Sequence, residues 1–329
     1  MRSRFLFVLL LIAFLFSGRQ PVPGADTVPV KEKPSWRVRM LWIPQAEFAG
    51  FYLAEAEGLY QAEGVKVVLE HPKTSEDVFE TLVKNETDIV VSWPTSALEQ
   101  VVKGVDVVNV GQMAQRSALM LIVNKKSGIT QPGDMKDRRI GLWPSWSLQV
   151  PFRKFLSHYG VETFRELPVL TSVDLFLYGG VDATVGVLYD DYYRIYGSGI
   201  NFDELICFRL SDTFPELVDD GLYCKRTTWE KSPEDCRKII RATMEGWRRA
   251  FQNKNRTLQI IREVQEKNGH PFNIVVQRWM LDVMEDLIFP NGTENDGVFK
   301  KASFDEAANL LEIDRKKFTY ERFVPGIGK

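Results

Sequence analysis

The chain has few of the residues that build covalently linked or metal-held folds. It contains three cysteines and three histidines in 329 residues, and the histidines lack the spacing of a zinc site. We expect Cys207, Cys224 and Cys236 to be small packed side chains; an exported protein could pair two of them, and the sequence does not say which. Neither a disulfide framework nor a structural metal is therefore expected.

An excess of charge of one sign is also missing. The net charge of −2 argues against non-specific nucleic-acid binding. Hydrophobic residues make up 44% of the chain and charged residues 26%, as in globular proteins. A length of 329 residues exceeds one ordinary domain and fits two lobes or two domains.

The apolar run at the N-terminus is typical of a secretory signal that spans residues 1–25. Arg2 and Arg4 form a basic start, residues 5–16 an apolar core, and residues 22–25 an exit of small residues. The run is too short to span a membrane comfortably, so we expect removal of the signal, with an uncleaved anchor as the alternative. No cysteine lies near the exit, which disfavours a lipoprotein. The prediction is a periplasmic protein.

Short β-branched runs alternate with amphipathic helical stretches up to about residue 190, a pattern that predicts an α/β fold with mainly parallel sheets. Two stretches repeat the order helix, turn, aspartate, buried strand, loop and helix, with Asp88 and Asp182 in matching places, which favours two similarly built lobes. Ser96 and Glu99 predict a capping box. From Ser232 the pattern is all-helical. Expected strands are 38–41, 65–69, 88–92, 105–110, 118–123, 139–143 and 180–189.

The most informative run is 42–52, Trp-Ile-Pro-Gln-Ala-Glu-Phe-Ala-Gly-Phe-Tyr. It follows a predicted strand and begins a helix that ends at Gly58. Unpaired backbone N–H groups and the helix dipole make such a junction suitable for a small polar ligand. Trp42 and Phe48 add flat apolar surface, and Gly50 permits a close approach to the backbone.

This run resembles the opening motif of type II periplasmic solute-binding proteins of the thiamine-pyrimidine-synthase-like branch. The resemblance extends from about Val38 to about Phe251. It implies the type II periplasmic-binding-protein fold, with a cleft between two lobes and C-terminal helices that pack on lobe 1. The implied domains are 36–122 plus 213–329 for a discontinuous lobe 1, and 123–212 for lobe 2.

Ligand contacts in such a fold come from loops at the carboxyl ends of strands. Aromatic, amide and hydroxyl residues gather at these predicted ends. Three assignments have structural alternatives: Ser96 as a helix cap, Trp93 as a filler of the cleft, and Asp191 as a helix cap where the family usually has glutamate. The candidate ligand-binding residues are Trp42, Gln45, Phe48, Gly50, Ser92, Trp93, Ser96, Gln115, Trp143, Trp146, Tyr189 and Asp191.

The resembling group also contains a synthase, whose chemistry needs a lysine for a Schiff base and nearby histidines. The lysine position is Ser92 here, and the two histidine positions are Ser96 and Phe48. The cysteine-rich run of the synthase is absent too. We therefore expect no enzyme activity, no cofactor and no catalytic residues.

The resemblance implies a monomeric solute-binding protein that delivers a small molecule to the permease and ATPase subunits of an ABC importer. Aromatic loop tips favour a planar nitrogenous ring, either a thiamine pyrimidine precursor or riboflavin. One alternative is a small anion such as a sulfonate or nitrate. A ligand-sensing module that contacts a membrane receptor is the alternative from another class.

Overall fold

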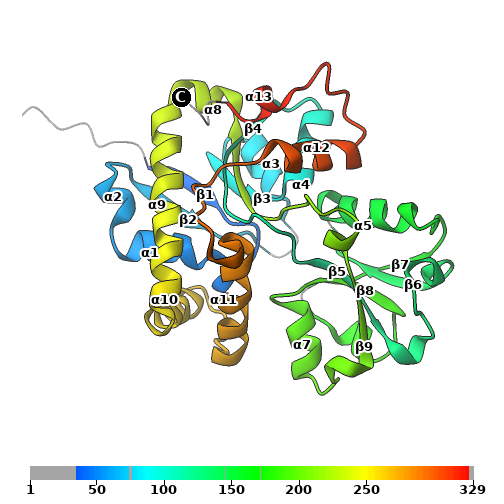
Figure 1. Cartoon of the computed structure of the whole chain (residues 1–329). Helices are drawn as coiled ribbons and strands as arrows, with labels where there is room; N and C mark the ends of the chain where they lie inside the picture. Colours follow the sequence, from blue (N-terminus) through cyan, green and yellow to red (C-terminus); the bar gives the residue numbers. More distant parts are fainter. Residues whose placement is uncertain (1–34, 74–75, 145, 171, 326–329) are drawn as a thin grey trace, which may run out of the picture. The chain divides into compact units, whose positions relative to one another are not determined.

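The computed structural model describes residues 35–73, 76–144, 146–170 and 172–325, without the side chains of residues 146 and 147 (Figure 1). These residues form two lobes, each built on a five-stranded mixed sheet with helices. The expected signal segment, 1–25, lies outside the described residues. Among the helices that are described, none is long and apolar enough to cross a membrane.

The first-lobe sheet has the strand order β2-β1-β3-β10-β4. Strand β1 pairs in parallel with β2 and β3, and β10 is inserted antiparallel between β3 and β4. β10 comes from the chain after the second lobe, so this lobe is built from two separate segments. Its strands are β1 (Trp36–Arg39), β2 (Val67–Glu70), β3 (Ile89–Ser92), β4 (Val107–Gln112) and β10 (Gly221–Lys225).

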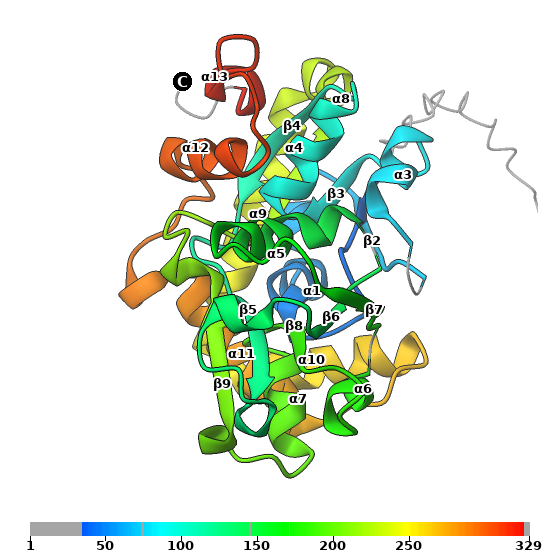
Figure 2. The same cartoon turned by 90° about the vertical axis from the view of Figure 1, so that its right-hand side faces the viewer.

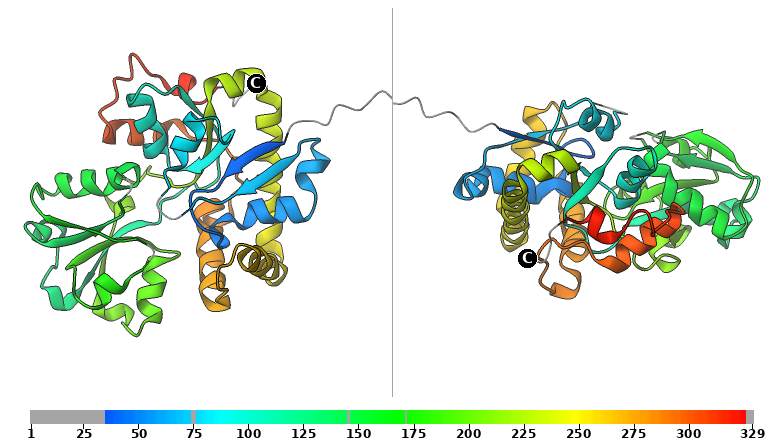
Figure 3. Two further views of the ribbon diagram at one scale, coloured as in Figure 1. Left: turned by 180° about the vertical axis from the view of Figure 1, so that it is seen from behind. Right: turned by 90° about the horizontal axis from the view of Figure 1, so that it is seen from above.

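The second-lobe sheet has the order β7-β6-β8-β5-β9, and its antiparallel strand is β5. β5 pairs only with strands of this sheet, so the lobe boundary that we expected at residue 122 falls inside β5 and belongs before it. Figure 3 shows the green strands of this lobe apart from the blue and cyan strands of the first. The strands are β5 (Leu119–Asn124), β6 (Arg139–Leu142), β7 (Arg165–Pro168), β8 (Ala183–Val187) and β9 (Leu205–Arg209).

Helices cover both sheets, and the C-terminal helices return to the first lobe. α9 packs on α1 and α2, and α12 packs on α4 and α5 (Figure 2). The helices are α1 (Ala49–Ala56), α2 (Leu59–Ala62), α3 (Val78–Val83), α4 (Pro94–Val102), α5 (Trp146–His158), α6 (Asp174–Leu177), α7 (Asp191–Gly197), α8 (Arg226–Lys231), α9 (Pro233–Gln252), α10 (Lys254–Lys267), α11 (Ile274–Ile288), α12 (Lys301–Leu310) and α13 (Tyr320–Phe323).

The two aspartates of the internal echo occupy the same structural place in the two lobes. Asp88 accepts hydrogen bonds from the backbone N–H of Arg37 at 2.9 Å and from its guanidinium at 3.0 and 3.1 Å. Asp182 accepts the same three bonds from Arg139, at 2.9, 2.6 and 3.1 Å. Each aspartate thus ties the start of a strand to its parallel neighbour, and the predicted correspondence is confirmed.

Two chain segments, 113–118 and 213–220, connect the lobes, and we call them the crossover pair. Met113 and Ala114 both donate their N–H to the carbonyl of Asp220 at 3.1 Å. The Gln112 side chain donates to the carbonyls of Asp219 and Asp220 at 2.9 and 3.0 Å. The segments are therefore hydrogen-bonded to each other where the chain passes between the lobes.

The start of α4 differs from the prediction, whereas the cysteines agree with it. The capping box at Ser96 and Glu99 is wrong, because α4 begins at Pro94 with Trp93 as its N-cap residue, so that Ser96 lies inside the first turn. The cysteines are free thiols, with Cys224 and Cys236 buried and Cys207 half-buried, as expected for packed side chains.

Candidate functional site

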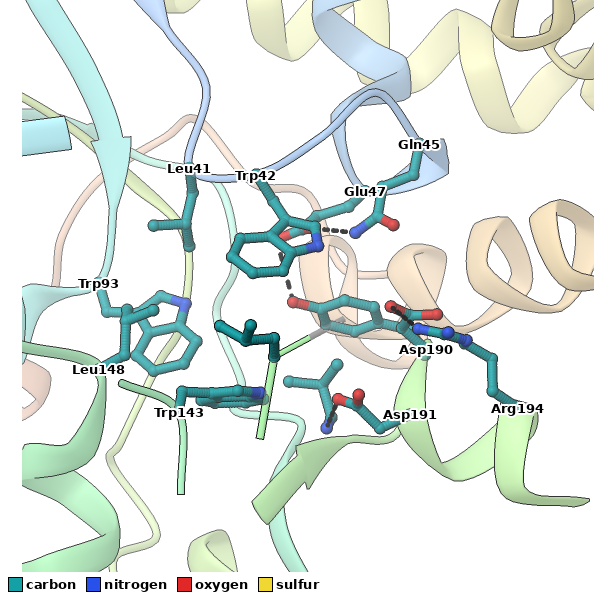
Figure 4. Close-up of a pocket in the computed structure, with 13 residues that line it drawn as sticks. Leu41, Trp42, Gln45, Glu47, Trp93, Trp143, Leu148, Asp190, Asp191 and Arg194 are labelled. Atoms are coloured by element: carbon teal, nitrogen blue, oxygen red, sulfur yellow. Dashed lines mark hydrogen bonds and ion pairs between the residues drawn. The ribbon is translucent and has the colours of Figure 1, made fainter. Parts of the chain in front are cut away.

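A cavity lies where strands of both lobes end (Figure 4). The first lobe contributes the segment after β1, the short helix η1 (Ala46–Phe48) and the residue after β3. The second lobe contributes the ends of β6, β7 and β8 and the starts of α5 and α7. The lining residues are Leu41, Trp42, Gln45, Glu47, Trp93, Trp143, Leu148, Leu170, Val187, Tyr189, Asp190, Asp191 and Arg194.

Three indole rings and one phenol ring form much of the wall. Trp93 from the first lobe and Trp143 from the second lie with ring centroids 5.8 Å apart and planes at 54°. Phe152 holds Trp143 by an edge contact at 5.4 Å. Trp42 and Trp143 lie on opposite sides of the cavity (Figure 4). Rings placed in this way offer flat apolar faces to a planar ligand, and each such pair is worth about 0.5–1.5 kcal/mol beyond area burial.

Glu47 provides a buried carboxyl group beside these rings, with 3% of its surface exposed. Its Oε1 accepts a hydrogen bond from the Tyr189 hydroxyl at 3.0 Å, which joins the two lobes. Its Oε2 accepts from Nε2 of Gln45. Burial raises the pKa of Glu47 to about 7, because removal from water disfavours the charged form.

Two neighbouring acids and one arginine complete the polar side of the cavity. Asp191, the first residue of α7, accepts the N–H of Val187 at 3.0 Å. Its removal from water and the adjacent Asp190 raise the pKa of Asp191 to about 7. Arg194 pairs with Asp190 at 3.8 Å, so the one cation among the described lining residues is already paired with an acid.

A second cavity adjoins the first, and five residues line both: Leu41, Trp42, Trp143, Leu148 and Leu170. Ser92 lines this second cavity, together with two further acids near the start of α3. The remaining lining residues are Glu76, Asp77, Val78 and Pro144. The candidate site is thus a continuous aromatic and acidic space rather than one small chamber.

The structure brings seven of the twelve candidate residues to these cavities: Trp42, Gln45, Ser92, Trp93, Trp143, Tyr189 and Asp191. Trp93 both lines the cavity and packs on Trp143, so the two alternatives for this residue are not exclusive. The side chain of Trp146 lies outside the described part of the chain.

Four other candidates point elsewhere. Phe48 is fully buried, with its ring 5.8 Å from His71. Gly50 does permit a close approach to the backbone, but the group that approaches is the indole of Trp247 and not a ligand. A Cβ on Gly50 would lie 2.3 Å from that ring. Ser96 is fully buried within α4. Gln115, which is part of the crossover pair, donates to the carbonyls of Gln112 and Val298 at 3.1 Å.

Sequence reasoning missed Glu47, Asp190 and Arg194 among the charged residues of the lining. Glu47 lies inside the 42–52 motif, and Asp190 is the neighbour of the predicted residue Asp191. For these two residues, closeness to predicted residues was the available signal. Within the described residues, no group of three or more His, Cys, Asp or Glu side chains is placed to hold a metal ion.

The fold and the site together define a two-lobed protein of the periplasmic-binding-protein class. Two solved structures have this fold: the aliphatic sulphonate-binding protein SsuA of Escherichia coli, with TM-score 0.64, 16% identity and coverage of 89% of this chain and 90% of that one, and the nitrate-binding protein NrtA of Synechocystis PCC 6803, with TM-score 0.58, 12% identity and 88% of each chain. The chain belongs to the NMT1/THI5-like family, which matches residues 45–257.

Two curated relatives align along most of the chain. The riboflavin-binding protein RibY of Chloroflexus aurantiacus is 24% identical over 324 residues, which cover 93% of this chain and 89% of the relative. The formylaminopyrimidine-binding protein of Halalkalibacterium halodurans is 20% identical over 296 residues, 88% of each. Both names describe binding proteins.

Proposed function

We propose that this protein is the solute-binding component of an ABC importer and binds a planar nitrogenous vitamin or vitamin precursor. The observation that carries the proposal is the cavity itself, where three indoles and a phenol from both lobes surround one space beside acidic groups. The candidate ligands are a thiamine pyrimidine precursor and riboflavin, in keeping with the names of the two curated relatives.

The charge of the cavities opposes the small-anion alternative that the sulphonate- and nitrate-binding neighbours suggest. Among the described lining residues of the two cavities, five are carboxylic acids and one is an arginine, which is itself paired with Asp190. A sulfonate or nitrate would have no unpaired cation among these residues and would disfavour ionisation of the neighbouring acids, which costs free energy where water is largely excluded. A ring whose N–H or O–H groups donate hydrogen bonds suits these acceptors.

A carrier role also fits the residues at the positions where the synthase needs its lysine and histidines. Ser92 lines the second cavity but cannot form a Schiff base, and Ser96 and Phe48 are buried away from both cavities. The protein therefore binds its ligand without transforming it. We further propose that residues 1–25 direct export and that the protein functions in the periplasm as a monomer. The permease would recognise the closed lobes.

Thermal-shift screening with the thiamine pyrimidine, thiamine, riboflavin, sulfonates and nitrate tests this function, because a ligand that binds only the folded state raises the Tm. We expect stabilisation by a ring compound, and roughly tenfold weaker binding to Trp42→Ala, since one stacking contact and its buried area are lost. Tyr178→Ala is the control, because Tyr178 is 87% exposed and lies outside both cavities. Stabilisation by sulfonates or nitrate alone would contradict the proposal.

A further inference from the structure

Glu47 is held in a fixed position between the cavity and α11. The backbone N–H of Glu47 points to Sδ of Met280 at 3.2 Å, and that of Ala46 donates to Oε1 of Gln277 at 2.7 Å. Both side-chain oxygens of Glu47 accept hydrogen bonds, one from Tyr189 and one from Gln45. A carboxyl group with this support cannot swing away from what lies opposite it.

The carboxyl group of Asp220 is a neighbour of Glu47, and the two side chains interact directly. Asp220 is 2% exposed, and its carbonyl accepts the two N–H groups that hold the crossover pair together. Its Oδ1 has no hydrogen-bond partner of standard geometry, and neither does Nε1 of Trp93, which faces the same carboxyl group. Two carboxyl groups that face each other away from water cannot both be ionised at low cost.

Among the described residues, no positively charged group is seen to relieve this pair. The titratable groups that face it are Tyr189 and Asp190 of the second lobe, Asp219 of the crossover pair, and the buried tyrosines Tyr52 of α1 and Tyr223 of β10. On the side of α11 its described neighbours are the uncharged Gln277 and Met280. The acids add negative charge, and Tyr189 stays neutral because burial raises its pKa further. A proton shared between the two carboxyl groups is the remaining way to lower the repulsion.

We propose that Glu47 and Asp220 share one proton and that this carboxyl pair makes ligand binding dependent on pH. Glu47 lines the cavity and joins the two lobes through Tyr189. Asp220 ends the crossover pair, directly before β10. With the proton in place, Glu47 keeps the Tyr189 hydrogen bond, and the lobes can close over a neutral ring. Without it, two facing carboxylates repel each other as the lobes close and exclude water. Ligand affinity therefore falls as the pair loses its proton. This inference rests on the proposed binding function.

The first experiment needs no ligand. Infrared difference spectra between the wild type and each of Glu47→Gln and Asp220→Asn detect the band of a protonated carboxyl group. We expect a band that both variants lack, present in the wild type at pH 6 and lost by about pH 8.5, the range set by the pKa of Glu47 near 7. Wild-type spectra that equal those of both variants at every pH would overturn the inference, whatever the protein binds.

The second experiment measures affinity for riboflavin or the thiamine pyrimidine, whichever stabilises the protein, between about pH 6.5 and 8.5, with the titration of the free ring measured separately and its contribution subtracted. We expect a loss of about tenfold in the wild type, because one proton that is bound more tightly in the complex changes affinity by up to a factor of ten per pH unit. Glu47→Gln and Asp220→Asn should reduce the change to within about threefold. Asp191→Asn tests the competing source of the slope, because Asp191 also lines the cavity and has a pKa of about 7. Glu55→Gln is the control that should keep the wild-type slope, because burial raises the pKa of Glu55 and this acid lies outside both cavities.

Calorimetry of the wild type alone provides a check that does not depend on whether a variant folds. If affinity falls with rising pH, binding takes up protons near pH 8, and the heat of binding then changes with the ionisation enthalpy of the buffer. Binding without proton uptake, or a slope that disappears in Asp191→Asn instead, would overturn the inference. Failure of every ring to bind would contradict the proposed function but leave the infrared result as the test of the pair.

Discussion

Gly50 of α1 and Gly246 of α9 lie against each other and allow these two helices to approach closely. A Cβ on Gly246 would lie 2.1 Å from the carbonyl oxygen of Gly50 and 3.0 Å from Cβ of Ala54. The obstacle is backbone, which cannot move aside as a flexible side chain can. The residue pair therefore fixes the position of the helix that follows the Trp42 motif.

Gly246→Ala should lower the free energy of unfolding by about 1–3 kcal/mol, the usual cost of an added methyl group in a packed interior. Urea unfolding followed by circular dichroism measures the change. Gly197→Ala is the matched control, since Gly197 ends α7 with open space around its Cα and should change stability by less than about 1 kcal/mol. Equal stability of Gly246→Ala and the wild type would show that the helices can separate without cost.

Among single residues, the tryptophans at strand ends were predicted correctly as cavity residues more often than the residues of the 42–52 motif. Trp42, Trp93 and Trp143 each follow a strand directly, so the rule for strand ends placed them. Phe48 and Gly50 belong to one turn of helix. The direction in which this turn points depends on its packing against α9, which lies about 200 residues further along the chain. Glu47 was missed for the same reason, because its partners Tyr189 and Asp220 come from other segments.

Among the elements, α11 makes a contact with the second lobe that does not touch the cavities. Trp279 of α11 donates its Nε1 hydrogen to the carbonyl of Leu188 at 3.0 Å. Its ring stacks on Tyr193 of α7 with centroids 4.7 Å apart and planes at 18°. Neither Trp279 nor Tyr193 lines either cavity. This contact therefore stabilises the arrangement of the lobes seen here independently of any ligand.

Trp279→Ala should weaken ring binding by about tenfold, because closing the lobes then loses a hydrogen bond and a stacked pair worth together about 1–2 kcal/mol. Trp279→Phe keeps the stacking and loses only the hydrogen bond, so its effect should be intermediate. Stopped-flow fluorescence should place the change mainly in faster ligand release. Wild-type affinity in Trp279→Ala would mean that this contact contributes nothing to closure.

The elements themselves were predicted unevenly, and the reasons are physical. Strands with a continuous apolar run, such as β3, β5 and β8, lie within two or three residues of their expected positions. The strands β7, β9 and β10 were not predicted. β7 is an edge strand with charged, largely exposed residues, and β10 begins with a glycine and pairs with strands more than 100 residues earlier. Pairing of that kind leaves no local pattern in the sequence.

For the whole molecule, buried acids and one buried histidine determine how stability changes with pH. Burial raises the pKa of Glu47, Asp191 and Asp219 to about 7. Such acids stabilise the folded state fully at pH values below their unfolded pKa and lose that contribution as pH rises through 7. Burial lowers the pKa of His71 to about 4, so its contribution is present above its unfolded pKa of 6.5 and is lost as pH falls towards 4.

Between pH 8 and 6.5 only the acids act, so mild acidification should stabilise the protein. Glu47, Asp191 and Asp219 together should add about 2–3 kcal/mol over this interval, which corresponds to a rise in Tm of a few degrees. Below pH 6.5 protonation of His71 in the unfolded state offsets the proton taken up by one of these acids, so the Tm should rise more slowly. Calorimetric scans at constant ionic strength measure the curve. Asp219→Asn and Glu47→Gln should each flatten its upper part, and a Tm that falls from pH 8 to 6.5 would contradict the assignment of neutral, buried carboxyl groups to the junction of the two lobes.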